Sequence, residues 1–264
     1  MNKTDAETLG EPSLWPRRTM IACDIFFREL CALAARAPVT LDLKLLPKGL
    51  HDLGAAEMRP RVQAAVDEVG AGGDAILLAY GLCNLGLDGI VARRCPLVLP
   101  RAHDCITLFL GDRARYRAYF EAHPGTYFHT TGWLERAAVG DDLRQLSIQR
   151  RTGMDRTYEE LVAEYGEDNA QYIREMLHPT QHYGQFTYIE MGLDADRRFI
   201  EESRRRAAEK NWTFESVPGA WGLLERLIAG PWDAADFLVV PPGYRVVAAH
   251  DDRIVRAEKV AAEM

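Results

Sequence analysis

Short apolar runs alternate with amphipathic segments along the first half of the chain. Buried parallel strands are continuous apolar runs, whereas helices that cover a sheet carry apolar residues three or four positions apart. The apolar runs predict strands at residues 20–23, 39–46, 75–80 and 96–99. The amphipathic segments predict helices at residues 25–36, 57–69, 103–110 and 112–122. This alternation is typical of a parallel sheet with helices on both of its faces.

The second half of the chain shows a similar alternation after an interval with weaker patterning. Residues 125–133 are aromatic and β-prone, and residues 136–153 are polar without a clear period. Residues 155–177 predict two helices that are interrupted at Gly166, because glycine often ends a helix. Further strands are predicted at residues 186–191, 212–217 and 237–240, with helices at residues 194–211 and 221–229 and a final hairpin around Asp251 and Asp252.

The pattern as a whole predicts an α/β protein with mostly parallel sheet and helices on both faces. Two Rossmann-like lobes and one long doubly wound sheet both fit this alternation. The expected organisation is a flexible N-terminal tail (1–18), a first lobe with the cysteine site (19–135), a helical connection (136–185) and a second lobe that ends in the hairpin (186–264).

Composition excludes several classes of protein. The 264 residues are 47% hydrophobic, which is too apolar for a mainly disordered chain. The formal net charge of −7 argues against a nucleic-acid binder and against a protein that binds anionic membranes. Residues 1–18 carry no apolar signal-peptide core, and no segment has the length of a membrane span. We therefore expect a cytoplasmic protein.

The five cysteines carry the most specific chemical information. Their odd number rules out complete disulfide pairing within one chain, and a reducing compartment favours metal binding or catalysis. Cys23, Cys83 and Cys105 each follow a predicted strand, whereas Cys31 and Cys95 are expected to be structural. Because the carboxyl ends of parallel strands form one crevice, the three strand-end cysteines are expected to converge there.

Three thiolates suit a soft metal site, either zinc or an iron–sulfur cluster. His103 and Asp104 lie beside Cys105 and are the candidate catalytic residues, acting by orienting a ligand or moving a proton. Gly81 and Gly86 would let the backbone approach a cofactor closely. The alternative is that the cysteines are small core residues, since their spacing matches no compact zinc motif.

Several segments together resemble the family DUF1638, a domain of unknown function. They are ILLAYGLCNLGLDGI, CPLVLPRAHDCITLFLG, HPGTYFHTTGW and EYGEDNAQYI, within a resemblance that spans about residues 19–241. The resemblance implies cysteines at the positions of Cys23, Cys83 and Cys105, and it suggests a link to corrinoid-dependent methyl transfer. It also points to Asn84 as a cofactor-binding residue, although here Asn84 follows the cysteine directly and the family loop has a small residue between them.

Three functions remain open at this point. The first is a metal-binding protein with a three-cysteine site that acts on a small-molecule substrate, with zinc or an iron–sulfur cluster as cofactor. The second is a non-catalytic partner or chaperone of a corrinoid methyltransferase. The third is an enzyme with a cysteine nucleophile and His103 as its base. Among the other histidines, His178 and His182 are expected to be exposed or capping residues, and His129 is either a strand residue or a pocket residue.

Overall fold

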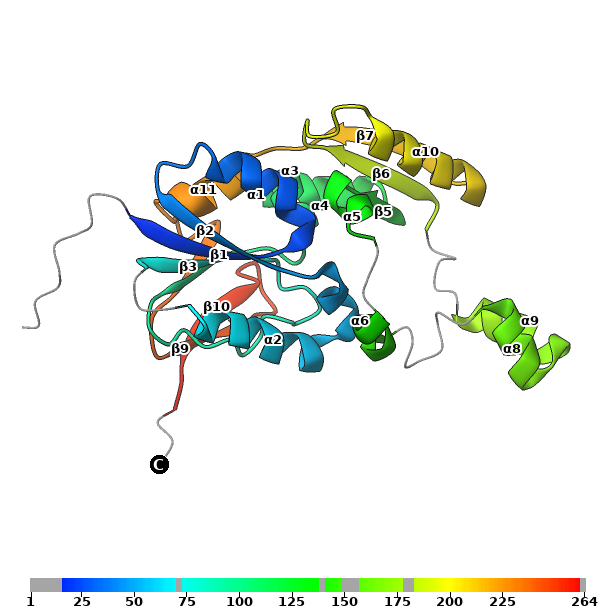
Figure 1. The fold of residues 1–264 in the computed structure, drawn as a ribbon, viewed down its shortest axis with the longest axis horizontal. Helices are drawn as coiled ribbons and strands as arrows, with labels where there is room; N and C mark the ends of the chain where they lie inside the picture. The colour runs from blue at the N-terminus through cyan, green and yellow to red at the C-terminus, as the bar shows by residue number, and fades with distance from the viewer. Residues whose placement is uncertain (1–15, 70–72, 138–140, 149–156, 178–182, 262–264) are drawn as a thin grey trace, which may run out of the picture.

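A computed structural model describes residues 16–69, 73–137, 141–148, 157–177 and 183–261. Most of the expected N-terminal tail lies outside the described residues, and so do His178 and His182. The described chain is mixed α/β and contains a five-stranded sheet, a three-stranded sheet and a two-stranded hairpin (Figure 1).

The five-stranded sheet has the order β2-β1-β3-β4-β8. Its strands are β2 (Thr40–Leu46), β1 (Arg17–Cys23), β3 (Ala75–Ala79), β4 (Leu97–Pro100) and β8 (Phe237–Val240). The first four are parallel, and β8 is antiparallel to β4. Every residue of β3 is buried, as the uninterrupted apolar run AILLA predicts for a central strand. The prediction of a mostly parallel sheet is therefore confirmed.

The order of the strands reverses direction at the centre of this sheet. From β1 the chain crosses outward to β2, and from β3 it moves the other way to β4. The connections that leave β1 and β3 therefore diverge at their carboxyl ends. Such a switch point leaves a crevice beside the strand ends, which is where ligands bind in open α/β sheets.

Helices cover both faces of the five-stranded sheet (Figure 1). α1 (Phe27–Ala34) and α11 (Gly222–Ala229) lie above it in that view. α2 (Ala55–Asp67) lies below, together with the hairpin of β9 (Tyr244–Ala248) and β10 (Val255–Lys259). The predicted hairpin around Asp251 is confirmed, since β9 and β10 are antiparallel.

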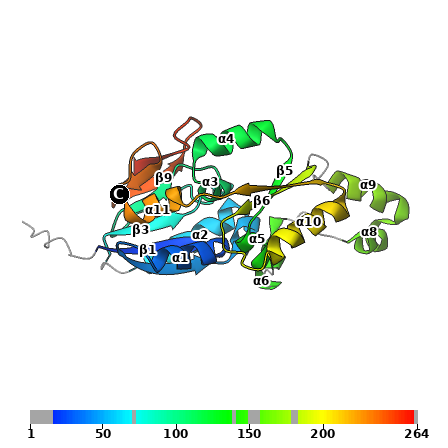
Figure 2. The same ribbon diagram turned by 90° about the horizontal axis from the view of Figure 1, so that it is seen from above.

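The three-stranded sheet is parallel and has the order β5-β6-β7. Its strands are β5 (Thr126–His129), β6 (Gln185–Glu190) and β7 (Thr213–Pro218). It lies beyond the carboxyl end of β1, with α5 (Thr131–Glu135) and α10 (Arg198–Lys210) packed on it (Figures 1 and 2). The end of the first sheet therefore faces a second layer instead of open solvent.

The first sheet contains β1 to β4 and also β8, whereas β5, β6 and β7 form the other sheet, so the strands are not divided between the two sheets in sequence order. The expected boundaries placed β5 in the first lobe and β8 in the second, whereas β5 pairs with β6 and β8 pairs with β4. β1 begins at Arg17, two residues before the expected start of the first lobe. Strand pairing depends on contacts between distant segments, which the local pattern does not encode.

The remaining described helical segments lie between these elements along the chain, and α8 and α9 lie to one side of both sheets (Figures 1 and 2). They are the 3-10 segments η1 (Asp24–Phe26) and η2 (Lys48–Leu53), and the helices α3 (Ile106–Leu110), α4 (Arg113–Ala122), α6 (Asp141–Leu146), α8 (Tyr158–Tyr165) and α9 (Glu167–Leu177). The predicted break between two helices is confirmed at Gly166, which has a φ of 78°. α6 lies within the segment for which the sequence showed no clear period.

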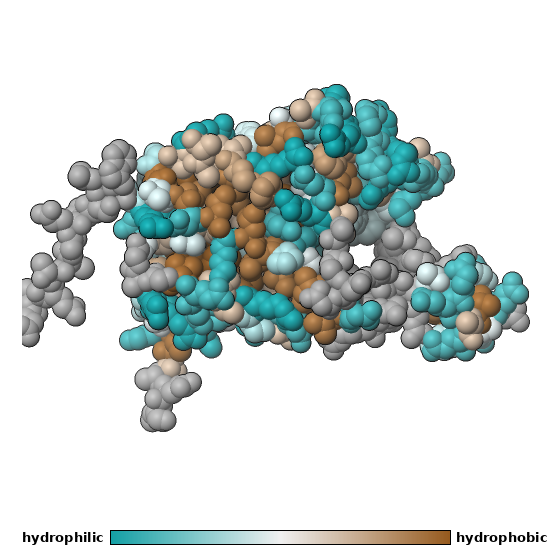
Figure 3. All heavy atoms as spheres, viewed as in Figure 1, coloured by the Kyte–Doolittle hydropathy of each residue, from teal (hydrophilic) through white to brown (hydrophobic). Residues whose placement is uncertain are grey.

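One edge of the five-stranded sheet remains apolar and partly exposed. β2 pairs with β1 on one side, and no described strand pairs with its other side. Leu41, Leu43 and Leu45 are partly exposed and pack on the core. Figure 3 shows apolar surface across this part of the molecule.

Candidate functional site

The structure places the three strand-end cysteines around the switch point. Cys23 is the last residue of β1, Cys83 lies in the loop after β3, and Cys105 directly precedes α3 after β4. Backbone N–H groups of Leu82 and Cys83 donate to the carbonyls of Ala102 and His103 at 2.8 and 3.0 Å. The backbone of Cys105 lowers the pKa of the Cys83 thiol, although burial raises it more strongly. The loops after β3 and β4 are therefore tied together at the cysteines.

Burial dominates the acid–base behaviour of the three thiols. It raises the pKa of Cys23 and of Cys83 to about 12, and it raises the pKa of Cys105 well above its usual value. Negative charge on Cys23 further raises the pKa of Cys83 and of Cys105, so the three sulfurs lie within electrostatic range of one another. Without a nearby cation, all three remain protonated thiols at neutral pH.

The three thiols do not form a preformed metal-binding site. Within the described part of the chain, no group of three or more His, Cys, Asp or Glu side chains is positioned to hold a metal ion.

Raised thiol pKa values also bear on the cysteine-nucleophile hypothesis, because the thiolate is the reactive form. We expect iodoacetamide at pH 7.5 to label exposed Cys31 rapidly and Cys23, Cys83 and Cys105 at least about tenfold more slowly, as measured by peptide mass spectrometry. The Cys31→Ser variant should lose the fast phase. Fast labelling of Cys105 at neutral pH would instead support a nucleophile.

Asp104 is positioned by two hydrogen bonds. Its Oδ1 accepts the backbone N–H of Ile106 at 3.0 Å, and its Oδ2 accepts the Tyr116 hydroxyl at 2.7 Å. Burial raises the pKa of Tyr116, and the Asp104 charge raises it further. Asp104 therefore fixes the start of α3 and one aromatic ring beside Cys105, which suits an orienting residue.

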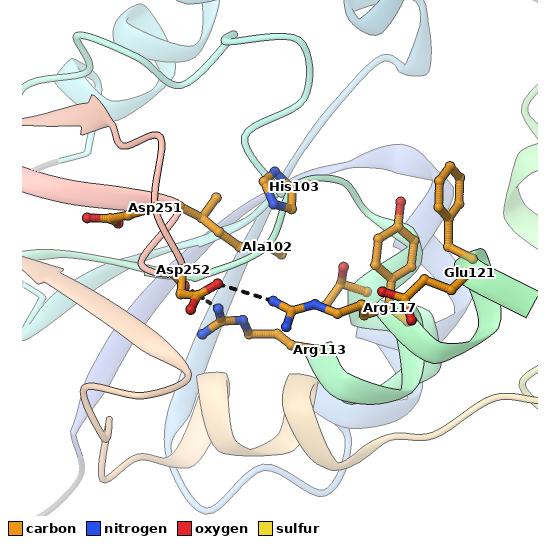
Figure 4. A pocket seen from close by; sticks show the side chains of 11 residues that line it. Ala102, His103, Arg113, Arg117, Glu121, Asp251 and Asp252 are labelled. Atoms are coloured by element: carbon orange, nitrogen blue, oxygen red, sulfur yellow. Dashed lines mark hydrogen bonds and ion pairs between the residues drawn. The ribbon is translucent and has the colours of Figure 1, made fainter.

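His103 faces a different cavity from Cys105. It is exposed and lines a space of about 320 Å³ together with Asp251 and Asp252 of the β9–β10 turn (Figure 4). In that cavity Arg117 pairs with Asp252 at 3.4 Å, and Arg113 donates to the Asp252 carbonyl. The structure thus separates the imidazole of His103 from the cavity that Cys105 lines.

The predicted cofactor-binding residues lie in the loop after β3. A Cβ on Gly81 would meet the Asp104 backbone at 2.5 Å, and one on Gly86 would meet the Met58 sulfur at 2.3 Å. Both glycines therefore permit close packing of protein against protein. Asn84 is exposed. A role for any of the three toward a cofactor stays a prediction.

The same loop has a strained backbone that the sequence did not reveal. Cys83, Asn84 and Leu85 have φ values of 45°, 54° and 65°, which are left-handed conformations that non-glycine residues avoid. The turn closes with a hydrogen bond from the Gly86 N–H to the Cys83 carbonyl at 3.0 Å. Strain of this kind persists where the surrounding structure enforces it and is concentrated at functional sites.

A larger cavity of about 370 Å³ lies between the two sheets beside Cys105. Its walls come from the segments after β1, β2 and β4 and from α4, β5 and α5. The lining residues are Ile25, His51, Asp52, Asp104, Cys105, Ile106, Phe109, Tyr116, Phe120, Thr126, Tyr127, Phe128, Thr130, Trp133 and Tyr183. Sequence reasoning did not identify Asp52, Tyr116 or Trp133 as site residues. The aromatic segment GTYFHTTGW was the available signal.

His129 is a packed strand residue. Its ring is buried, stacks on Phe186 at 4.3 Å, and its Nδ1 lies 2.8 Å from the Ser203 hydroxyl oxygen. Burial lowers the pKa of His129 to about 4, so it is neutral at physiological pH. Of the two alternatives for this residue, the packed histidine is the one observed.

Comparison with protein-family models gives one match, which covers residues 45–228. The chain belongs to the DUF1638 family. That family is described as a protein of unknown function, and its matched range includes Cys83 and Cys105 but begins after Cys23. Comparison with curated proteins and with solved structures found no match. None of the described helices combines the length and the apolar character needed to cross a membrane.

Proposed function

We propose that this DUF1638 protein binds a soft metal, as zinc or an iron–sulfur cluster, through Cys23, Cys83 and Cys105. The proposal is supported by the placement of the three thiols at or after the carboxyl ends of β1, β3 and β4, beside the strand-order reversal. The cavity next to Cys105 supports a small-molecule substrate, since its volume falls in the range of ligand sites.

The acid–base state of the thiols determines how such binding depends on pH. Metal ligation requires thiolates, so a metal must displace protons from groups whose pKa is raised by burial. We therefore expect apparent metal affinity to rise with pH. Three thiolates leave one position of a tetrahedral ion for substrate, where zinc would supply Lewis-acid polarisation of a thiol or methyl donor.

This chain's own residues would shape the site around the metal. Asp104 holds the start of α3, and its carboxylate also holds the hydroxyl of Tyr116 toward the same cavity wall. Its negative charge raises the pKa of Cys83 and Cys105 and would favour a cation beside them. Asp104 therefore acts as a positioning residue in this proposal, while His103 faces the other cavity.

Metal analysis of anaerobically purified protein tests the proposal. We expect about one zinc, or about four iron with matching sulfide, per chain. Cys83→Ser should lower this content at least tenfold, and Cys23→Ser and Cys105→Ser should behave alike. The matched controls are Cys31→Ser and Cys95→Ser, which alter thiols away from the crevice and should retain the metal.

Two outcomes would contradict the proposal. One is a zinc and iron content well below one per chain in the wild-type protein, even after reconstitution under reducing conditions. The other is a metal content that none of the three crevice substitutions changes. Circular dichroism of each variant separates loss of metal from loss of fold.

Other expectations remain predictions from the sequence. The link to corrinoid-dependent methyl transfer depends on the family resemblance, and the Rossmann-like character of the lobes and the cytoplasmic location depend on the residue pattern. A non-catalytic partner of a corrinoid methyltransferase would retain binding to that protein after substitution of all three cysteines. The cysteine-nucleophile alternative receives less support, because burial raises the thiol pKa values.

A further inference from the structure

The cavity between the sheets has a predominantly aromatic wall. Its rings come from α3, α4, β5, α5 and the chain just before β6, and belong to Phe109, Tyr116, Phe120, Tyr127, Phe128, Trp133 and Tyr183. Trp133 stands at 66° to Tyr127 and at 81° to His51, with ring centroids 6.4 and 6.2 Å apart. Rings at steep angles form adjoining walls of a box rather than one stacked layer.

The charged groups on this wall are acidic. Asp52 and Asp104 line the cavity, and among its described lining residues none is lysine or arginine. The negative faces of aromatic rings and carboxylates both attract cations. The wall therefore combines two features that favour a positively charged ligand.

A cation of the protein itself already uses one of these rings. The Lys48 ammonium lies 3.9 Å from the centroid of the Trp133 ring, and the charge of Asp52 acts on the same group. Lys48 is not part of the cavity wall. Burial lowers the pKa of Lys48, whereas the negative charges of Asp52 and Asp24 oppose that change, so carboxylates already act on a cation that lies over this ring.

We propose that this cavity binds a compact organic cation of the methylated-ammonium class, held by the aromatic rings around Trp133 and by the carboxylates of Asp52 and Asp104. Methylated ammonium groups are favoured over primary amines, because rings cannot replace the hydrogen bonds that an NH₃⁺ group makes with water. A volume of about 370 Å³ accommodates a small cation of this kind. The recognition uses no thiolate, although Cys105 and Asp104 of the proposed metal site line the same cavity.

A matched pair of probes tests this inference on the full chain. Choline and its uncharged isostere 3,3-dimethylbutan-1-ol differ mainly in charge, so their affinities isolate the cation contribution. By isothermal titration calorimetry we expect choline to bind at least about tenfold more tightly than the alcohol. The measurement should be made with and without prior chelation, and we expect chelation to leave the difference unchanged.

Variants locate the binding site. Asp52→Asn and Trp133→Leu should each weaken choline binding about tenfold or more. Asp67→Asn and Trp232→Leu are the controls, since Asp67 pairs with Arg93 and Trp232 lies under Arg18, both outside this cavity. Asp52→Asn preserves side-chain size and keeps the test informative if Trp133→Leu fails to fold.

Three results would overturn the inference: no choline binding, equal binding of choline and the alcohol, or unchanged binding in Asp52→Asn. Each is independent of the metal content of the protein. If choline does not bind, the proposal that three cysteines bind a metal is unaffected. If the protein binds no metal, the choline experiment still tests the proposed cation site.

Discussion

Replacing Gly132 by alanine is expected to destabilise the protein by at least about 3 kcal/mol. Gly132 lies in α5, and a Cβ at this position would stand 1.7 Å from the backbone oxygen of Ile25. That oxygen belongs to η1, directly after Cys23, so it cannot rotate away as a side chain would. Relief of the clash requires α5 to separate from η1.

Chemical unfolding monitored by circular dichroism measures this effect. Gly184→Ala is the matched control, because no described atom lies within 4 Å of a Cβ there and that variant should stay within about 1 kcal/mol of wild type. Since Ile25 and Trp133 both line the larger cavity, Gly132→Ala should also weaken choline binding. A stability equal to that of wild type would show that α5 and η1 are not in close contact.

The second large effect concerns Glu29, a buried carboxylic acid in α1. Its side chain is fully buried, and neither carboxylate oxygen has a hydrogen-bond partner among the described residues. Burial raises the pKa of Glu29 from 4.5 to about 7, and the backbone N–H of Glu29 and the charge of Arg28 only partly oppose this. The folded protein therefore holds a proton that the unfolded chain releases.

The direction of the pH dependence follows from proton binding. Between pH 4.5 and about 7 the folded state binds more protons than the unfolded state, so the free energy of unfolding falls as pH rises. Above this window the loss amounts to about 3 kcal/mol. Glu29→Gln removes the ionisable group while keeping its shape, so the variant should match wild type near pH 4.5 and exceed it by about 3 kcal/mol at pH 8.

Urea unfolding across this pH range checks the prediction. Glu225→Gln serves as control, because Glu225 is an exposed partner of Arg36 and should contribute less than about 1 kcal/mol. The informative quantity is the difference between Glu29→Gln and wild type at each pH, which cancels the titration of other groups. A difference that stays constant from pH 4.5 to 8 would contradict a raised pKa at Glu29.

Local pattern was sufficient to predict most helices and strands. The run AILLA predicted a central strand, and β3 is buried at every residue. Gly166 separates α8 from α9 as expected, and Thr157 and Glu160 form a capping box at the start of α8. These features depend on near neighbours in the sequence. The pairing of β8 with β4 and of β5 with β6 depends on distant segments and could not be predicted locally.

The features of the candidate site likewise divide into those that the sequence predicted and those that it did not. Strand-end placement predicted that Cys23, Cys83 and Cys105 lie near one another, because parallel strands share one carboxyl edge. It also grouped His103 with Cys105, since they are two residues apart. The structure separates them, because the chain between β4 and α3 presents His103 to one cavity and Cys105 to the other.

The sequence by itself determined the α/β character of the chain and the strand-end position of three cysteines, because hydrophobic period and strand termini are local properties. Its motifs indicated the family. Only the tertiary structure decided that a second sheet closes over the switch point and surrounds a cavity with aromatic rings and two carboxylates. Those groups come from residue 52, residues 104–133 and residue 183, and they line one cavity only when these distant parts of the chain pack together. The raised pKa values of the thiols and of Glu29 have the same origin, since burial is a property of the packed molecule.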